Sequence, residues 1–313
     1  MKALIIGATG FVGGHLINEL EKARWDVCGT KLPTEKADIS ILLYELDIQN
    51  AGEVLDVITQ SKPDCVFHLA AQSSVAVSWN KPALTVDINV KGVINLLEAV
   101  RAQEKPPKVI LVGSSEEYGE IKPDELPVSE NTPLRPVNMY ACTKATQGMI
   151  GKLYAKAYNL SIISVRAFNH IGPGQSDTFV IPNFCKQVAE IEATGKKGVI
   201  DVGNLNSKRD FTDVRDIVRA YRLLADYGKS GEVYNIGSGK AISIEECLRI
   251  ILEQSKTEIT TRQVKSRMRP SDTPTIEADI SRLVECTGWK PEILLNETLA
   301  DVLAEWRRKT GGG

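Results

Sequence analysis

The chain has 313 residues, of which 42% are hydrophobic and 25% charged, and its formal net charge at pH 7 is −2. This composition predicts a fully folded globular protein, and the nearly balanced charge without a basic stripe argues against a nucleic-acid partner. The six cysteines lack metal-ligand spacing, and the N-terminal apolar run is too short to span a membrane. We therefore expect a cytoplasmic protein with reduced thiols, no bound metal and no membrane partner.

Short apolar runs alternate with amphipathic stretches through the first half of the chain. We expect strands near residues 3–6, 27–30, 65–69 and 108–112, and helices near residues 12–22, 51–61 and 90–103. This alternation predicts an α/β fold with a doubly wound parallel sheet of the Rossmann type, covered by helices on both faces.

Beyond about residue 166, glycines and prolines break the pattern into shorter elements, which predicts a smaller α/β lobe. A helix near 213–227 is followed by a strand near 233–236 that can rejoin the first sheet. We therefore expect interleaved lobes. The cofactor-binding domain is predicted at residues 1–168 with 211–237, and the substrate-binding lobe at residues 169–210 with 238–313.

Three glycines, Gly7, Gly10 and Gly13, lie between the first predicted strand and the first predicted helix. At this place glycine permits a tight turn, close approach of the backbone to a pyrophosphate, and close packing of helix on strand. The spacing predicts a dinucleotide site, although a turn beside a closely packed helix uses the same residues.

The second predicted strand ends in Thr30 and Lys31, where NAD-selective folds usually place an acid. A hydroxyl and a cation favour the additional phosphate of NADP(H), with NAD(H) as the alternative cofactor and a solvated surface lysine as the ordinary interpretation of Lys31. Asp47 and Ile48 follow a third strand, between the strands near 27–30 and 65–69, where such folds bind adenine, although an acid there is often only a helix cap.

Tyr140 and Lys144 are four residues apart on a predicted helix and can therefore meet one ligand. An ammonium group beside a phenol stabilises its phenolate, which fits the phenol for acid–base catalysis. Ser114 and Ser115 follow the strand at 108–112, at the carboxyl edge where open α/β sheets bind ligands. A polar turn is the ordinary interpretation of the two serines, and an amphipathic helix is that of Tyr140 and Lys144. The co-occurrence of these motifs argues against both interpretations.

Taken together, these motifs resemble the extended short-chain dehydrogenase/reductases along nearly the whole chain. The resemblance rests on the three glycines, His68-Leu69-Ala70-Ala71, Asn89, Ser114, Tyr140-x-x-x-Lys144 and Arg209-Asp210-Phe211. It implies an NAD(P)-dependent oxidoreductase with Ser114, Tyr140 and Lys144 as catalytic residues. The cofactor would also contact Thr9, Phe11, Val12, Leu69, Ala70, Ala71 and Asn89.

Narrower motifs resemble the GDP-6-deoxy-4-keto-mannose reductases, which make GDP-D-rhamnose. This resemblance rests on the segments Phe168-Asn-His-Ile-Gly-Pro-Gly-Gln175 and Arg269-Pro-Ser-Asp272. The resemblance implies NADPH-dependent reduction of the 4-keto group of GDP-4-dehydro-6-deoxy-D-mannose, with His170 beside the cofactor. It also implies a homodimer formed through the helices near 90–101 and 140–158. The implied sugar-nucleotide contacts are Ser73, Ser115, Glu116, Asn169, Val180, Arg209, Arg269 and Asp272.

Glu116 leaves a second enzyme class open. It lies two residues before Tyr118, where the GDP-mannose 4,6-dehydratases carry a glutamate that acts on the sugar. A dehydratase is therefore the first alternative and a nucleotide-sugar epimerase the next, while the segment after Asn169 favours the reductase. A non-catalytic NADP-binding regulator is the alternative from another class, and it has no need of Ser114, Tyr140 and Lys144 together.

Overall fold

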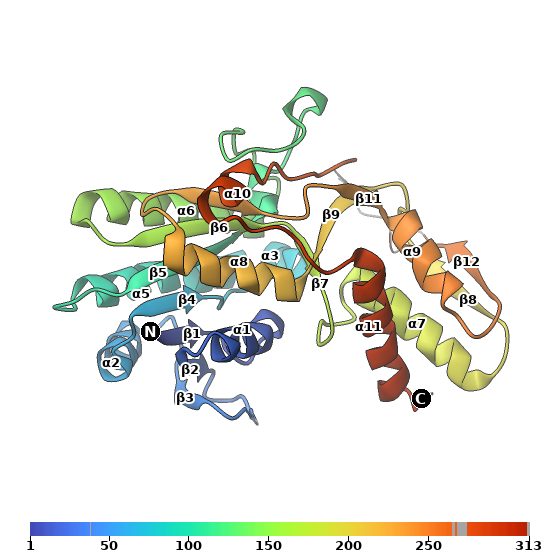
Figure 1. The fold of residues 1–313 in the computed structure, drawn as a ribbon, viewed down its shortest axis with the longest axis horizontal. Coiled ribbons are helices and arrows are strands. Elements are labelled where there is room, and N and C mark those ends of the chain that lie inside the picture. Colours follow the sequence, from blue (N-terminus) through green and yellow to red (C-terminus); the bar gives the residue numbers. More distant parts are fainter. Residues whose placement is uncertain (38, 265–266, 268–273, 312–313) are drawn as a thin grey trace.

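The computed structural model describes residues 1–37, 39–264, 267 and 274–311. Its larger lobe contains a parallel seven-stranded sheet in the order β10-β6-β5-β4-β1-β2-β3 (Figure 1). This sheet confirms the predicted Rossmann-type fold class. Its strands are β1 (Lys2–Ile6), β2 (Asp26–Lys31), β3 (Leu42–Glu45), β4 (Cys65–His68), β5 (Lys108–Ser114), β6 (Ile162–Ala167) and β10 (Val233–Ile236).

Both faces of this sheet are buried, as the continuous apolar runs predict. In β1, Ala3 and Ile5 face one core, and Leu4 and Ile6 face the other, because successive side chains of a strand alternate between its faces. Helices α1 (Phe11–Lys22) and α8 (Val214–Tyr227) pack over the first core. The opposite core is covered by α2 (Ala51–Ser61), α5 (Gly92–Arg101) and α6 (Met139–Tyr158).

Short elements connect these layers. Two short helices and a π-helical turn over Asp87–Lys91 lead from β4 into α5, and a further short helix lies against α8 and β10. The short helices are α3 (Val75–Asn80), α4 (Pro82–Val86) and α10 (Ser281–Thr287).

The second lobe lies on the far side of the molecule from β3 and α2, with the C-terminal end of α11 at its lower edge (Figure 1). It contains a three-stranded sheet, a parallel two-stranded sheet and three helices around one apolar core. Its strands are β7 (Asn169–Ile171), β9 (Lys208–Asp213), β11 (Ala241–Ser243), β8 (Gly198–Val202) and β12 (Ile259–Gln263). Its helices are α7 (Val180–Thr194), α9 (Ile244–Glu253) and α11 (Leu295–Lys309).

The chain passes between the lobes more than once. After β9 it enters α8 and then β10, which pairs with β6 in the large sheet. The predicted domain border between residues 210 and 211 falls inside β9, and the division into two domains remains a prediction. Within the described part of the chain, no helix is both long and apolar enough to cross a membrane.

The order of the strands determines where a ligand can bind. From β1 the chain proceeds to β2 and β3 on one side, and β4, β5 and β6 follow on the other side. Ligands of open α/β sheets bind at such a switch point, beside the carboxyl ends of the strands. The loops after β1, β4, β5 and β6, which carry the predicted motifs, all begin at this edge.

Candidate active site

The glycine loop joins β1 to α1. Gly7 has φ +89°, and a Cβ there would lie 2.9 Å from the backbone nitrogen of Ala70. A Cβ on Gly13 would lie 2.4 Å from the carbonyl oxygen of Ala8. Glycine at these two positions is therefore required by the turn and by close helix packing.

Gly10 is different, because none of the residues that the structure describes requires a glycine there. Its φ is −75°, and a Cβ would approach the carbonyl oxygen of Gly7 no closer than 3.5 Å. Gly10 caps α1 without a side chain, so the N-cap residue supplies no side-chain oxygen to the first N–H groups of the helix. A backbone left open at a helix N-terminus fits the pyrophosphate of a dinucleotide.

The predicted phosphate-binding pair is already engaged in contacts within the protein. The hydroxyl of Thr30 is buried and accepts a hydrogen bond from the backbone N–H of Gly7 at 3.1 Å, so it fastens the glycine loop to β2. The Nζ atom of Lys31 donates to Glu45 Oε1 at 3.0 Å and to the carbonyl oxygen of Glu35 at 3.2 Å. The ammonium group of Lys31 therefore lies at the end of β2, in a partly exposed ion pair with Glu45.

Asp47 and Ile48 follow β3 at the same edge. The carboxylate of Asp47 accepts from the backbone and side-chain amides of Gln49, at 3.0 and 3.3 Å. Ile48 is buried against Gly92 of α5, where a Cβ would approach it to 2.9 Å. Both residues shape the loop after β3, at the edge where the adenine site was predicted.

The loop after β4 runs beside the glycine loop. The N–H groups of Leu69 and Ala70 both donate to the carbonyl oxygen of Ile6, at 3.0 and 2.9 Å. Asn89 is fully buried, and its side-chain amide bonds to both backbone groups of Gln72, at 2.8 and 3.1 Å. Asn89 also donates to the hydroxyl of Thr143 at 3.0 Å. It thereby joins the loop after β4, which includes Ala71, to the helix that carries Tyr140 and Lys144.

Ser114 is the last residue of β5 and the N-cap of a 3-10 turn over Ser115–Tyr118. Its hydroxyl accepts from the N–H of Glu116 at 3.2 Å. Its own N–H donates to Glu117 Oε1 at 2.9 Å, which completes a capping box. Ser115 is buried, whereas the half-buried Glu116 accepts from the Asn138 side-chain amide at 3.1 Å.

Tyr140 lies in the first turn of α6, and Lys144 follows one turn later. Lys144 is buried and donates to the carbonyl oxygen of Val112 at 2.8 Å. Burial raises the pKa of Tyr140, a hydrogen bond with Ser114 lowers it, and the Glu116 charge raises it. Burial lowers the pKa of Lys144 to about 8. At neutral pH the phenol therefore keeps its proton, as a proton donor must.

His170, in β7 of the second lobe, lies against the helix that follows the glycine loop. Its ring stacks on Phe11 of α1, with centroids 6.1 Å apart and planes 9° apart. Its Nδ1 bonds to the carbonyl oxygen of Phe168 at 3.0 Å, and burial lowers its pKa. His170 and Phe11 therefore lie together at the N-terminus of α1, beside Val12, and the contact of His170 with a cofactor stays a prediction.

The predicted substrate residues come from several elements. β7 pairs with β9 so that Asn169 lies beside Phe211, and Arg209 lies two residues before Phe211 on the same face of the strand. Val180 is the first residue of α7 and is partly exposed, and Ser73 is exposed in the loop after β4. The remaining two, Arg269 and Asp272, lie outside the described residues.

The family model described as "GDP-mannose 4,6 dehydratase" matches residues 4–302 of this chain. The chain belongs to this family. The glycine loop and the predicted catalytic residues Ser114, Tyr140 and Lys144 all lie within the matched residues.

Individual relatives divide between two reactions. GDP-6-deoxy-D-mannose reductase of Pseudomonas aeruginosa is 31% identical, with 98% of each chain covered. GDP-mannose 4,6-dehydratase of Yersinia enterocolitica is 28% identical, covering 97% of this chain and 93% of the relative. Family membership therefore shows an NAD(P)-dependent enzyme acting on nucleotide sugars and includes both predicted reactions.

Solved structures agree with the fold over its full length. The structure of RMD from Pseudomonas aeruginosa complexed with NADPH has a TM-score of 0.88 and 31% identity, covering 99% of this chain and 100% of that one. UDP-glucose 4-epimerase from Thermotoga maritima, with UDP-glucose, has a TM-score of 0.87 and 27% identity, with 99% of each chain covered.

Three residues beside the site were not singled out from the sequence, namely Glu35, Glu117 and Arg166. The hydroxyl of Thr9 donates to Glu35 Oε2 at 2.7 Å, so a carboxylate lies against the glycine loop. Glu117 and Arg166 form a buried ion pair directly behind Ser114. One sequence signal was present for this pair: Arg166 is the charged residue in the mostly apolar run of β6, and a buried charge needs a partner.

Proposed function

We propose that this protein reduces the 4-keto group of GDP-4-dehydro-6-deoxy-D-mannose with NADPH, giving GDP-6-deoxy-D-mannose, also called GDP-D-rhamnose. The observation that carries the proposal is the arrangement of Ser114, Lys144 and a protonated Tyr140 at the sheet edge that also holds the glycine loop. The sugar and its nucleotide are supported by similarity to the GDP-6-deoxy-D-mannose reductase over 98% of both chains.

Each residue of the site has its own role in the proposed reaction. NADPH, when bound, would supply the hydride for carbon 4 of the sugar. Tyr140 donates its phenolic proton to the ketone oxygen as negative charge develops there, and the product is a secondary alcohol. The Lys144 ammonium stabilises the phenolate that is left, and the Ser114 hydroxyl donates a hydrogen bond to the ketone oxygen.

Other residues bind and orient the two ligands. The open backbone at Gly10 and the N-terminus of α1 would hold the pyrophosphate of the cofactor, and Lys31 the phosphate on its adenosine ribose. Arg209 from β9, with Arg269, would hold the pyrophosphate of the sugar nucleotide, since arginine forks suit phosphate oxygens. Residues 1–168 with 211–237 would then form the cofactor domain and the rest the substrate lobe.

A GDP-mannose 4,6-dehydratase is the second candidate, and a specific observation favours it. The carboxylate of Glu116 lies in the turn after β5, and its negative charge raises the pKa of Tyr140. Dehydration requires a group that moves protons at carbons 5 and 6, which a carboxylate in this turn can supply.

One assay separates the two candidates. The purified protein is incubated with GDP-mannose alone, and separately with the 4-keto-6-deoxy product and NADPH. We expect NADPH oxidation and formation of GDP-6-deoxy-D-mannose in the second reaction only. Consumption of GDP-mannose without added reductant would establish the dehydratase instead.

We further propose a cytoplasmic homodimer formed through α5 and α6. These helices pack against each other and leave apolar side chains at the surface, with Met149 62% and Leu153 63% exposed. Ile94 of α5 is also exposed, at 37%. An exposed apolar face on two adjacent helices is stabilised when a second copy covers it.

A further inference from the structure

Glu117 is a buried carboxylate that the proposed mechanism does not use. Its Oε1 accepts from the backbone N–H of Ser114 and its Oε2 from Arg166 Nε, each at 2.9 Å. The side chain occupies space that only a glycine at position 113 leaves open, because a Cβ on Gly113 would lie 2.2 Å from Oε1. The backbone of Ser114 is therefore fixed by this carboxylate.

Arg166 holds the other side of the pair. It lies in β6, and its guanidinium stacks over the ring of Tyr118 at 4.8 Å and donates to the Tyr118 hydroxyl at 3.0 Å. It also donates to the carbonyl oxygen of Glu130 at 3.3 Å. These contacts hold the Arg166 guanidinium in place without Glu117. The guanidinium therefore fixes the position of the Glu117 carboxylate to which it donates.

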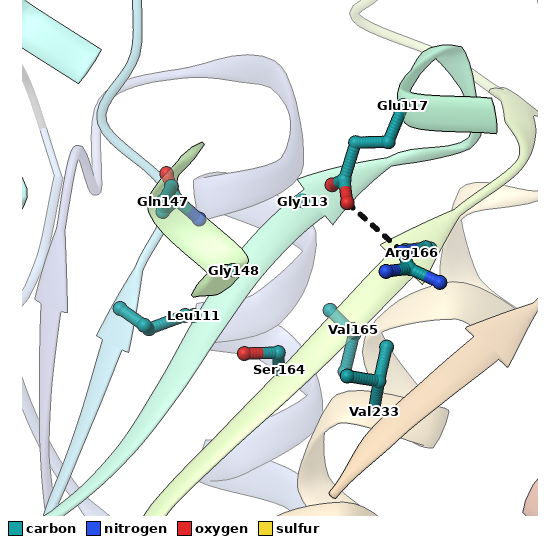
Figure 2. A pocket seen from close by; sticks show the side chains of 9 residues that line it. All are labelled: Leu111, Gly113, Glu117, Gln147, Gly148, Ser164, Val165, Arg166 and Val233. Atoms are coloured by element: carbon teal, nitrogen blue, oxygen red, sulfur yellow. Dashed lines mark hydrogen bonds and ion pairs between the residues drawn. The ribbon is translucent and has the colours of Figure 1, made fainter. Parts of the chain in front are cut away.

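A small cavity separates this ion pair from the catalytic helix. Figure 2 shows Gln147 and Gly148 of α6 on one side of it, and Glu117 and Arg166 on the other. Its volume is about 10 Å³, too little for more than one water molecule. A Cβ on Gly148 would lie 3.8 Å from Glu117 Oε2, so the carboxylate reaches α6 one turn after Lys144. Bulk water therefore does not screen the charge of Glu117 from α6.

The groups that face Lys144 come from each element around it. Its ammonium donates to the carbonyl oxygen of Val112 on β5 and, at 3.3 Å, to Gln147 Oε1 on its own helix. From β4 it faces His68, which is fully buried, and burial and the Lys144 charge lower the pKa of this imidazole to about 3. Glu117 raises the pKa of Lys144 from the turn after β5.

Tyr140 has its own set of neighbours. Ser114 bonds to its hydroxyl, the charges of Glu116 and Glu117 raise its pKa, and the phenol of Tyr221 lies near it from α8. Glu117 is therefore the carboxylate that acts on both Tyr140 and Lys144 among the described residues. Burial raises the pKa of Glu117 itself, and the charge of Arg166 and the N–H of Ser114 lower it, so these two partners favour the ionised carboxylate.

We propose that Glu117 is a positioning residue for the reduction: it fixes the backbone of Ser114 and holds a negative charge behind α6 that keeps both protons on the Tyr140–Lys144 pair. The inference rests on the proposed function in taking Tyr140 as the proton donor. A negative charge opposes the loss of a proton from either member of the pair, so the site stays in the acid form that reduction requires.

Glu117→Gln tests this proposal through a pH titration. Protein labelled with ¹³C in tyrosine and lysine is titrated by NMR, with the two signals assigned from Tyr140→Phe and Lys144→Met. We expect the first proton of the pair to be lost about one pH unit lower in Glu117→Gln than in the wild type. The alkaline limb of kcat/KM for reduction should move in the same direction, because turnover is lost as the pair loses its proton.

Three further variants separate charge from packing. Glu117→Asp keeps the charge and should titrate like the wild type, as should Ser164→Ala, which changes an uncharged wall of the same cavity. If Glu117→Gln does not fold because Arg166 is left unpaired, Glu117→Gln/Arg166→Gln removes both charges and should still show the shift.

Unchanged titration in the variants that lack the Glu117 charge would overturn the proposal, and so would an equal shift in Ser164→Ala. The ion pair would then only fasten β5 to β6. Because the NMR titration needs no turnover, a wild-type protein without reductase activity would reject the proposed function while the titration still decides the role of Glu117.

Discussion

The ammonium group of Lys144, on α6, donates a hydrogen bond to the carbonyl oxygen of Val112, on β5, at 2.8 Å. Val112 lies two residues before Ser114, so this bond fixes α6 against the strand that carries the predicted catalytic serine. The three predicted catalytic residues are thereby held by one strand and one helix, which is the rigid support that a positioned proton donor needs.

Tyr140→Phe should lose most of its turnover and still bind both ligands. The variant removes only the phenolic oxygen, so the proton donor disappears while the ring and the site around it stay. We expect kcat to fall by about 100-fold or more, with unchanged binding of NADPH by fluorescence titration. Near-normal turnover would show that another group protonates the ketone oxygen.

The cation at the end of β2 should determine the preference between cofactors. We expect the wild type to show a higher kcat/KM with NADPH than with NADH, and Lys31→Ala to lower this ratio by about tenfold, or ~1.4 kcal/mol. Glu45→Gln is the matched control, because it breaks the same ion pair but keeps the ammonium group. A wild type that clearly favours NADH would contradict the assignment.

The residue before Lys31 offers a second test of the same preference. Thr30→Asp places a carboxylate where NAD-selective folds carry one, and the ratio should shift toward NADH. Since the Thr30 hydroxyl accepts from the N–H of Gly7, an aspartate can keep that bond and preserve the glycine loop. Thermal denaturation checks that the fold is intact, and an unchanged ratio in a folded variant would count against this site.

Arg209→Ala should weaken binding of GDP much more than binding of NADPH. A guanidinium that bonds to a pyrophosphate contributes about 1.5–3 kcal/mol, so we expect Kd for GDP to rise by at least tenfold in calorimetry. Arg249→Ala removes an exposed arginine of α9 that pairs with Glu246, and it should leave Kd unchanged. Equal affinities of wild type and Arg209→Ala would place Arg209 outside the substrate site.

Glu116→Gln should reduce the ketone at a rate within about tenfold of the wild type, or ~1.4 kcal/mol of barrier. The amide keeps the length of the side chain and its hydrogen-bonding reach to Asn138 but cannot transfer a proton at neutral pH. Single-turnover reduction with a measured substrate Kd is the readout. Abolished reduction with intact binding would make Glu116 catalytic.

Met149→Glu/Leu153→Glu should convert the proposed dimer into monomers. The two added charges would be buried without partners if α6 lies at the interface between copies. Light scattering after size-exclusion chromatography gives the mass, and Val199→Glu, which changes an exposed apolar residue of β8, should leave it unchanged. A wild-type monomer, or a dimeric double variant, would contradict the proposed interface.

Local patterns determined much of the fold and part of the site. Short continuous apolar runs predicted β1, β2, β4 and β5, and the helical patterns at 12–22 and 51–61 match α1 and α2 closely. The glycine loop and the four-residue spacing of Tyr140 and Lys144 are equally local. A strand, a turn or a helix face is specified by neighbouring residues, so the sequence alone can predict it.

Contacts between distant segments were decided only by the tertiary structure. Helix α7 was not predicted, because Pro182 and the surrounding glycines hide a helix that is stabilised by packing against α11 and α9. The sequence predicted Thr30 as a phosphate ligand, whereas in the structure its hydroxyl accepts a hydrogen bond from the N–H of Gly7. Likewise Glu117 meets Arg166 across 49 positions of chain, and only the pairing of β5 with β6 brings them together. The residue types were visible in the sequence, but their partners depend on which strands become neighbours.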